Sequence, residues 1–191
     1  MYTQKTNNAE NRYQIIVILF FVFLAGCIIG WIYEMGFYRI DMGHFVKRGQ
    51  GIGPWLPIYG VGCLAITALF YQYRLSPVTV FLGSAVVAGG IEFVTGWALF
   101  HFGNGLRLWD YNIEIWNWGN IGGYVCLRSI LLFGIAGVLV VNLLAPAISR
   151  LVSGIRRDIL TLVVVILAIL FVADIVFGYF IRPFLGMVIK I

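Results

Sequence analysis

Residues 159–181 read ILTLVVVILAILFVADIVFGYFI, and Asp174 is the only charged side chain in this stretch. An α-helix rises about 1.5 Å per residue, so roughly 20 apolar residues cross a hydrocarbon layer about 30 Å thick. The stretch therefore predicts a transmembrane helix. A helix is the structure expected here because it satisfies its own backbone hydrogen bonds where the backbone meets lipid.

Four other stretches have the same apolar character and a comparable length. Together with residues 159–181 they predict an all-α integral membrane protein with about five transmembrane helices. We expect a polar N-terminal tail over residues 1–14 and one multi-pass transmembrane domain over residues 15–191. The four further helices are expected at about residues 15–38, 55–73, 78–102 and 124–147.

The composition of the whole chain agrees with this class of protein. Of its 191 residues, 61% are hydrophobic and 11% are charged, whereas soluble domains are about 45–50% apolar and about 25% charged. These proportions argue against a water-soluble monomer, a nucleic-acid-binding protein and a disordered chain. The net charge of +5 fits the basic bias of cytoplasmic loops, and the bilayer is the expected partner.

The distribution of basic residues predicts a cytoplasmic N-terminus in the plasma membrane. When the basic residues inside motif-like segments are left out, more Lys and Arg residues lie on the membrane face of the N-terminus than on the opposite face. Leu24-Ala25-Gly26-Cys27 resembles a lipoprotein signal-peptidase site, but the apolar run continues past Cys27, which favours an uncleaved first helix. The basic residues counted are Lys5, Arg12, Arg74, Arg150, Arg156 and Arg157 against Arg182 and Lys190.

Three carboxylates, Glu34, Glu92 and Asp174, interrupt the predicted spans. A charged side chain at a helix centre costs about 2.5–3.5 kcal/mol on insertion scales, so protein partners or water must compensate for it. Each of the three lies past the middle of a helix that runs in the same direction, so all three are displaced towards one membrane face. The same face carries a polar, Gly-rich loop over residues 39–53, an aromatic loop over residues 103–123, and Arg128.

Two interpretations of these carboxylates remain open. Small residues from Ala85 to Gly96 share one helix face with Glu92, which places this carboxylate in the helix bundle and away from lipid. Glu34 and Glu92 either bind a ligand or ion, or form structural ion pairs with Arg48, Arg107 or Arg128. A structural role is favoured for Asp174 and for the interfacial Arg39 and Arg107.

The segment from Lys47 to Gly60 is rich in glycine and contains Arg48, Gly49, Gly53 and Tyr59. It lacks the Gly-Lys-Ser/Thr of a Walker loop and no strand precedes it, so it is not a nucleotide-binding motif. Free backbone amides next to Arg48 suit an anion such as a phosphate headgroup. A tight re-entrant turn that needs glycine for close packing is the alternative.

The aromatic loop, which includes Trp109, is typical of an interfacial belt, and Asp110 either binds a ligand or pairs with a nearby arginine to fix the loop. His44 and His101 are isolated in the sequence, and Cys27, Cys63 and Cys126 show no metal-ligand spacing. We therefore predict no catalytic group, metal site or cofactor.

The chain also shows a weak internal repeat. A helix with a glutamate, a polar loop and a second helix occur in residues 15–73 and again in residues 78–147. Parallel repeats of this kind occur in transporters.

Five groups of residues form an ordered set of motifs: Gly30-Trp31 with Glu34; Arg48-Gly49, then Gly53-Pro54 and Pro57-Ile58-Tyr59-Gly60-x-Gly62; Glu92-Phe93-x-Thr95-Gly96; Leu108-Trp109-Asp110-Tyr111; and Asn120 with Gly123 and Cys126-Leu127. In this order and spacing they resemble the CmpB-like family of bacterial membrane proteins, described as putative ABC-transporter type IV or putative ABC transporter permease. The chain departs from the family pattern at Lys47, where asparagine is favoured, and at Tyr124, where a basic residue is favoured. Arg128 can supply the second charge.

Three functions remain open at this point. The resemblance favours a permease-like transport subunit whose polar cluster binds an ion or a small anionic solute, working as a homodimer or with a partner ATPase. The alternatives are an intramembrane enzyme acting on a lipid or lipid-linked phosphate, and a non-catalytic assembly or regulatory protein. Binding candidates for the first two functions are Glu34, Arg48, Gly49, Gly53, Tyr59, Glu92, Asp110 and Arg128.

Overall fold

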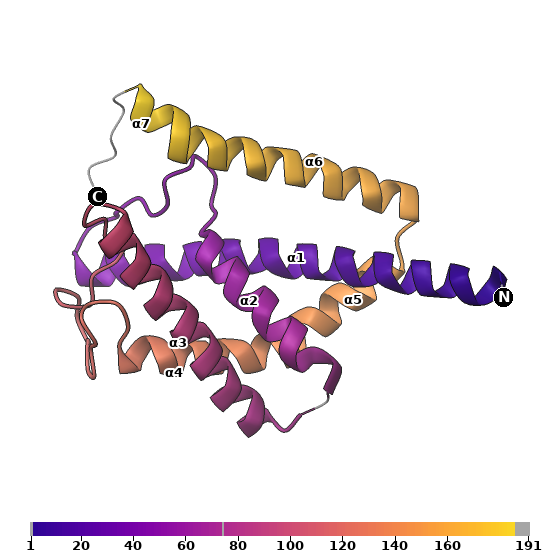
Figure 1. Ribbon diagram of the computed structural model, residues 1–191, viewed down its shortest axis with the longest axis horizontal. Helices are drawn as coiled ribbons and strands as arrows, with labels where there is room; N and C mark the ends of the chain where they lie inside the picture. The colour runs from indigo at the N-terminus through magenta and orange to yellow at the C-terminus, as the bar shows by residue number, and fades with distance from the viewer. Residues whose placement is uncertain (1, 74, 186–191) are drawn as a thin grey trace. The chain divides into compact units, whose positions relative to one another are not determined.

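The computed structural model describes residues 2–73 and 75–185, with side chains from Glu10 onward. The described residues form helices at all five predicted positions and no strand, apart from an isolated bridge between Ile121 and Val125. Figure 1 shows these elements. They are α1 (Tyr2–Asp41), α2 (Pro57–Phe70), η1 (Tyr71–Tyr73), α3 (Pro77–Phe102), α4 (Leu127–Leu139), η2 (Val140–Leu144), α5 (Ala145–Ser153), α6 (Arg157–Val176), η3 (Phe177–Ile181) and α7 (Arg182–Phe184).

The helix ends differ from the hydropathy-based expectation because apolar composition does not mark where a helix stops. α1 begins at Tyr2, so residues 2–14 of the polar segment belong to the first helix. The fourth helix runs without a break through η2 to Ser153, and the fifth runs through η3 to Phe184. Arg74 and Lys190, which entered the count of basic residues, lie outside the described residues.

Among the described residues, four helices are long and apolar enough to cross a membrane. The 14-residue α2 is shorter and covers about 21 Å, to which η1 adds about 6 Å. The four long spans are Glu10–Asp41, Pro77–Phe102, Leu127–Ser153 and Arg157–Phe184.

The chain divides into two compact units, which are described separately. Unit 1 comprises residues Met1–Gly60 and Pro146–Ile191, and unit 2 comprises Val61–Ala145.

In unit 1, α6 runs in the same direction as α1, as Figure 1 shows. Near the start of α6, Tyr13 donates a hydrogen bond to the Arg157 carbonyl oxygen at 3.2 Å. Further along both helices, the rings of Phe23 and Phe171 pack edge to face with their centroids 5.3 Å apart. Contacts in this order along both helices define a parallel pair.

The parallel direction of α1 and α6 bears on whether α2 crosses the membrane. Crossings alternate in direction, so two parallel spans must be separated by an odd number of other crossings. α3 and the helix from α4 to α5 are two, and α2 supplies the third. The short α2 is therefore the second of five crossings, as the sequence predicted.

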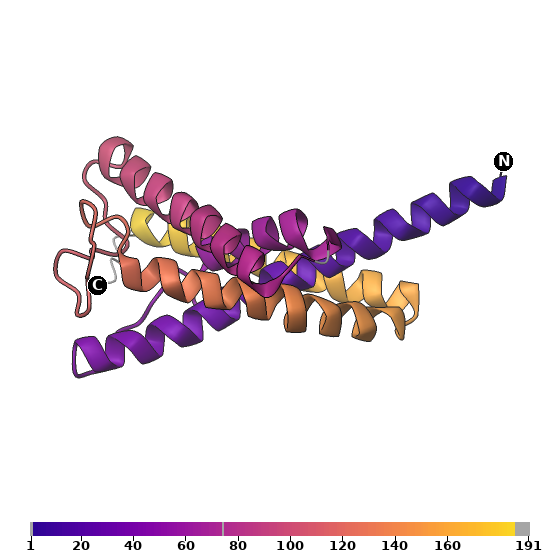
Figure 2. The ribbon, with the colours of Figure 1, turned by 90° about the horizontal axis from the view of Figure 1, so that it is seen from below.

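Unit 2 is built on an antiparallel pair, α3 and α4, whose opposite directions can be followed in Figure 2. The helices approach closely through small residues: Gly89 packs against Ile130, and Gly137 packs against the Ser84 side chain. Ile66 of α2 joins Val80, Ala88 and Val141 in the buried apolar core. Contact through small residues is the expected mode for helices in a bilayer, where lipid is as apolar as the side chains.

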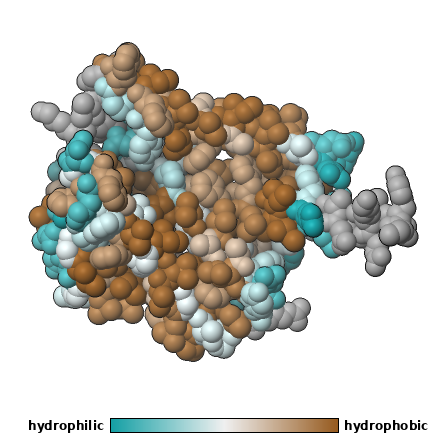
Figure 3. Space-filling model, in the orientation of Figure 1, coloured by the Kyte–Doolittle hydropathy of each residue, from teal (hydrophilic) through white to brown (hydrophobic). Residues whose placement is uncertain are grey.

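The apolar surface of α6 lies mostly outside the core of the protein. Only 6% of the most hydrophobic part of the span Arg157–Phe184 is buried, and Leu162 and Ile169 of α6 and Phe180 of η3 are each at least 60% exposed. Figure 3 shows apolar side chains covering the visible side of this helix. An exposed apolar surface of this extent fits contact with lipid tails.

Five crossings predict that consecutive loops are reached from opposite sides of the membrane. We expect cysteines introduced by His44→Cys and Ser76→Cys, in a chain whose three native cysteines are replaced by alanine, to react with a membrane-impermeant thiol reagent from opposite sides. Ser153→Cys should react from the same side as Ser76→Cys. Labelling of His44→Cys and Ser76→Cys from one side would show that α2 does not cross.

Candidate functional site

Unit 1 contains a nearly buried ion pair between α1 and the Gly-rich loop. Arg48 Nε lies 2.6 Å from Glu34 Oε2, and the two side chains are only 7% and 13% exposed. The Arg48 guanidinium also stacks over the Tyr38 ring, 4.0 Å from its centroid. We call Glu34, Arg48, Tyr38 and Tyr59 the Glu34 cluster.

The second oxygen of Glu34 is bound from the start of α2. Tyr59 donates its hydroxyl hydrogen to Glu34 Oε1 at 3.0 Å. The Tyr59 ring reaches this position because it packs directly on Gly30, where a Cβ atom would collide with it. The Leu56 amide donates to the Cys27 carbonyl oxygen at 3.1 Å and holds the α2 end against α1. Gly30 is therefore required by the approach of Tyr59 to Glu34.

The backbone amides of the Gly-rich loop bind a carboxylate of the chain itself. Asp174 Oδ1 accepts the amide of Ile52 at 2.7 Å, and both its oxygens lie 3.2 Å from the amide nitrogen of Gly53. The sequence predicted that these amides would suit an anion, and in this structure the anion is Asp174. Arg182 of α7 donates a hydrogen bond to the Gln50 carbonyl oxygen of the same loop at 3.4 Å.

Two glycines allow this loop to lie against α6 and η3. A Cβ atom on Gly51 would collide with the Asp174 carboxylate, and one on Gly178 would lie 2.7 Å from the Gln50 carbonyl oxygen and the Gly51 nitrogen. Gly49 has φ +83°, a conformation that glycine adopts without strain. The alternative prediction of a glycine-dependent tight turn thus agrees with the packing of this loop.

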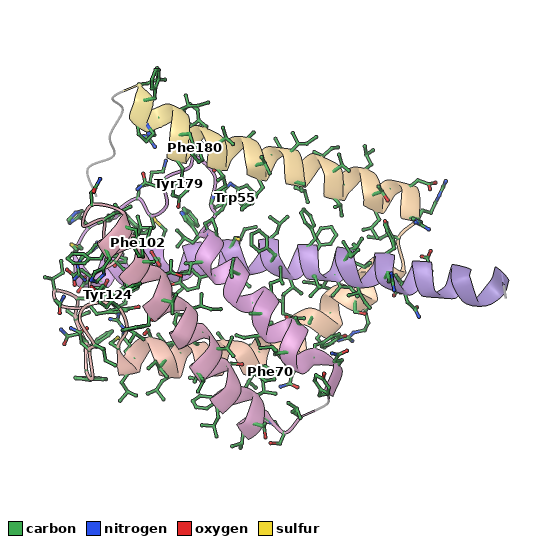
Figure 4. The ribbon with its side chains drawn as sticks, viewed as in Figure 1. Trp55, Phe70, Phe102, Tyr124, Tyr179 and Phe180 are labelled. Carbon is green, nitrogen blue, oxygen red and sulfur yellow. The ribbon has the colours of Figure 1, made fainter. Side chains whose placement is uncertain are left out.

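Aromatic side chains also line the space between α6 and α1 in unit 1. Figure 4 shows Trp55 and Tyr179 between α6 and α1. The Trp55 ring packs edge to face on Phe171, with centroids 5.8 Å apart. Tyr179 is close enough to Glu34 for an electrostatic interaction.

Unit 2 contains a second buried carboxylate, Glu92 of α3. It is 6% exposed and accepts hydrogen bonds from the Tyr111 hydroxyl at 2.5 Å and from Ser129 Oγ at 2.8 Å. Tyr111 comes from the aromatic loop and Ser129 from the first turn of α4. Burial and the negative charge of Glu92 raise the pKa of Tyr111 well above its ordinary value, so this hydroxyl keeps its hydrogen and can donate it.

Arg128 forms its ion pair with a residue that the sequence analysis missed. Its Nη2 lies 2.7 Å from Glu114 Oε2, with side chains 10% and 3% exposed, and its Nη1 donates to the Ile115 carbonyl oxygen at 2.5 Å. The guanidinium carbon is 5.3 Å from the centroid of the Tyr111 ring. We call Glu92, Tyr111, Ser129, Arg128 and Glu114 the Glu92 cluster.

Asp110 and Arg107 organise the aromatic loop. Asp110 Oδ1 accepts the backbone amide of Asn112 at 3.0 Å and lies 3.3 Å from Arg107 Nη1. Arg107 also donates to the Gly122 carbonyl oxygen at 3.1 Å, and Trp109 donates to that of Tyr124 at 3.0 Å. These contacts hold the loop over the end of α3 and so bring Tyr111 to Glu92.

Arg39, the remaining candidate for an ion pair, lies at the surface. Arg39 is exposed, donates to the Gly43 carbonyl oxygen and lies 5.4 Å from the centroid of the Phe45 ring. No group of three or more His, Cys, Asp or Glu side chains that could hold a metal occurs in residues 2–73 and 75–185.

The two clusters share one layout, which follows the repeat noticed in the sequence. In each, a glutamate past the middle of a long helix takes one donor from the following loop and one from the following helix. The donors to Glu34 are Arg48 and Tyr59, and the donors to Glu92 are Tyr111 and Ser129.

The helices and the buried charged clusters define a multi-pass, all-α membrane protein with polar sites inside its units. Residues 21–179 match the model of the family described as putative ABC-transporter type IV. The chain belongs to this family, as its motifs had indicated. No curated protein matches the chain, and no solved structure matches it.

Breaking the Glu34–Arg48 pair should destabilise the protein strongly. Glu34→Gln leaves the Arg48 guanidinium buried beside a neutral group, and breaking a buried pair costs about 3–5 kcal/mol. The measurement is unfolding by denaturing detergent, followed by tryptophan fluorescence. The control, Arg157→Gln, breaks the exposed Glu10–Arg157 pair and should cost less than about 1 kcal/mol. Equal losses in the two variants would contradict the expectation.

Removing the charge of Asp174 should loosen the Gly-rich loop. Asp174→Asn weakens the hydrogen bonds from Ile52 and Gly53, and hydrogen bonds to a charged group contribute about 1.5–3 kcal/mol. We expect faster hydrogen exchange of these two amides, measured by mass spectrometry. Asp158→Asn removes an exposed carboxylate and should leave the exchange unchanged. Unaltered exchange in Asp174→Asn would show that the loop is held by other contacts.

Proposed function

We propose that this chain is a permease-like subunit of a membrane transport system, and that the Glu34 cluster binds the anionic oxygen of a small solute. The observation that carries the proposal is the nearly buried Arg48, held over the Tyr38 ring and paired with Glu34 in a membrane-spanning unit. Charged residues inside membrane proteins are costly and mark ligand and ion pathways. Membership of the ABC-transporter-related family supports a transport role.

The chemistry of the cluster suits exchange of anions at Arg48. A guanidinium binds carboxylates and phosphates through several N–H donors in a fixed plane. Glu34 serves as its counter-ion within the chain, so an arriving anion would replace one carboxylate by another negative group and Arg48 would keep a partner. The Tyr59 hydroxyl, which donates to Glu34, would hold this carboxylate while the arriving anion binds Arg48, and would let it return to Arg48 when the anion leaves.

The family description implies an energy source outside this chain. We propose that the protein works with an ATPase subunit, as a homodimer or with further chains, in the bacterial plasma membrane with its N-terminus in the cytoplasm. The basic residues Arg150, Arg156 and Arg157 near the connection between α5 and α6 support this orientation.

Anion binding can be measured on the purified chain with inorganic phosphate as the probe. We expect phosphate to raise the unfolding temperature of the wild-type protein in lipid nanodiscs, because a ligand that binds the folded state stabilises it. Arg48→Gln should abolish the increase, and Arg157→Gln should retain it. An equal increase in both variants would contradict binding at Arg48.

The transport role has its own test. A nucleotide-hydrolysing subunit that co-purifies with the chain should show lower ATPase activity with Arg48→Gln than with the wild-type chain after joint reconstitution. A deletion strain with an altered lipid profile and no such subunit would instead favour the enzyme acting on lipids.

A further inference from the structure

The hydroxyl of Ser129 has more acceptors within reach than it can serve. Ser129 Oγ lies 2.8 Å from Glu92 Oε2 and 2.9 Å from the Cys126 carbonyl oxygen. It also accepts the Cys126 amide at 3.3 Å, in the reciprocal cap of α4. A serine hydroxyl has one hydrogen and two lone pairs, so it can donate to Glu92 or to Cys126, but not fully to both.

A proton on Glu92 gives each of these contacts its own hydrogen. The protonated Oε2 donates to Ser129 Oγ, and Ser129 then donates to the Cys126 carbonyl oxygen. Tyr111 still donates to Oε1 at 2.5 Å. When the proton leaves, Ser129 turns its hydrogen to Glu92, and the Cys126 carbonyl oxygen keeps the amide of Ile130 at 3.1 Å. Both states are hydrogen-bonded without movement of the heavy atoms.

The burial of the cluster also favours binding of a proton. Glu92 and Glu114 are both 6% exposed, and Arg128 lies 2.7 Å from Glu114. Burying a carboxylate in its charged form is costly at this depth. The titratable or charged groups of the cluster besides Glu92 are Tyr111 and Glu114 from the aromatic loop and Arg128 from α4.

We propose that Glu92 is a proton-binding site of this membrane protein, with Ser129 as the hydroxyl that changes its acceptor when the proton binds and leaves. The bond formed is O–H on Glu92 Oε2, and the proton is exchanged with water. The ion bound by the Glu92 cluster is thus a proton. This proposal rests on the proposed transport function only for the use of that proton in coupling.

Infrared difference spectroscopy on the full chain in lipid nanodiscs measures the protonation directly. We expect the wild-type protein to show the carbonyl stretching band of a protonated carboxylic acid, which disappears on alkaline titration. Glu92→Gln should lack this band and still fold, because the glutamine amide can donate to Ser129 as the acid does. Asp158→Asn, which removes an exposed carboxylate, should keep the band.

The hydroxyl variants keep the test decisive if Glu92→Gln fails to fold. Ser129→Ala and Tyr111→Phe each remove a hydrogen bond from Glu92, so each should shift the band in frequency. An unchanged band in Glu92→Gln would overturn the proposal, as would an unshifted band in both hydroxyl variants.

The two proposals can fail separately. The band at Glu92 without any ATPase-coupled transport would leave proton binding intact and remove the transport function. Transport activity in a protein that lacks the band would keep the transport function and rule out proton binding at Glu92.

Discussion

A carboxylate inside the hydrocarbon part of a bilayer must receive its hydrogen bonds and its counter-charge from the protein, because lipid tails supply neither. Glu34, Glu92 and Asp174 are all placed under this constraint by apolar helices. Their donors come from loops and from the first turns of neighbouring helices, so the connecting segments fold back against the spans. The loops pack closely against the helices because they carry the donors that the buried carboxylates need.

The three carboxylates meet the constraint with different donors, and the donor decides what each can do. Arg48 brings a full positive charge to Glu34, which suits the binding and exchange of anions. Backbone amides hold Asp174 and attach a loop to a helix. Hydroxyls hold Glu92, and a hydroxyl can donate or accept, so its partner can exist with or without a proton.

Hydropathy alone was enough to place the helices, because lipid selects continuous apolar runs of a given length. The burial of Glu92 could be predicted from the small residues at helical spacing beside it, and Arg48 was among the partners considered for Glu34. The partner of Asp174 could not be predicted, because every residue except proline carries a backbone amide and only the folded loop shows which ones converge. Glu114 was missed because it lies outside the predicted apolar spans, where a charged residue is expected at the surface, and its neighbours Ile113 and Ile115 alone do not show that the loop buries it. Tyr111 was part of a motif but not a predicted partner of Glu92, because only the folded loop brings the two side chains together.

The contact of Gly51 with Asp174, and of Gly178 with the loop backbone, has a consequence for how this sequence can vary. Two surfaces that pack through side chains can exchange a large residue on one side for a small one on the other, and such pairs change together over time. Gly178 meets loop backbone, which no substitution makes smaller, and Gly51 meets the carboxylate that the loop amides bind, so neither contact has a side chain that can shrink to make room for a larger residue. We therefore expect positions 51 and 178 to be invariant without covariation, and a contact map inferred from correlated substitutions would leave this junction blank.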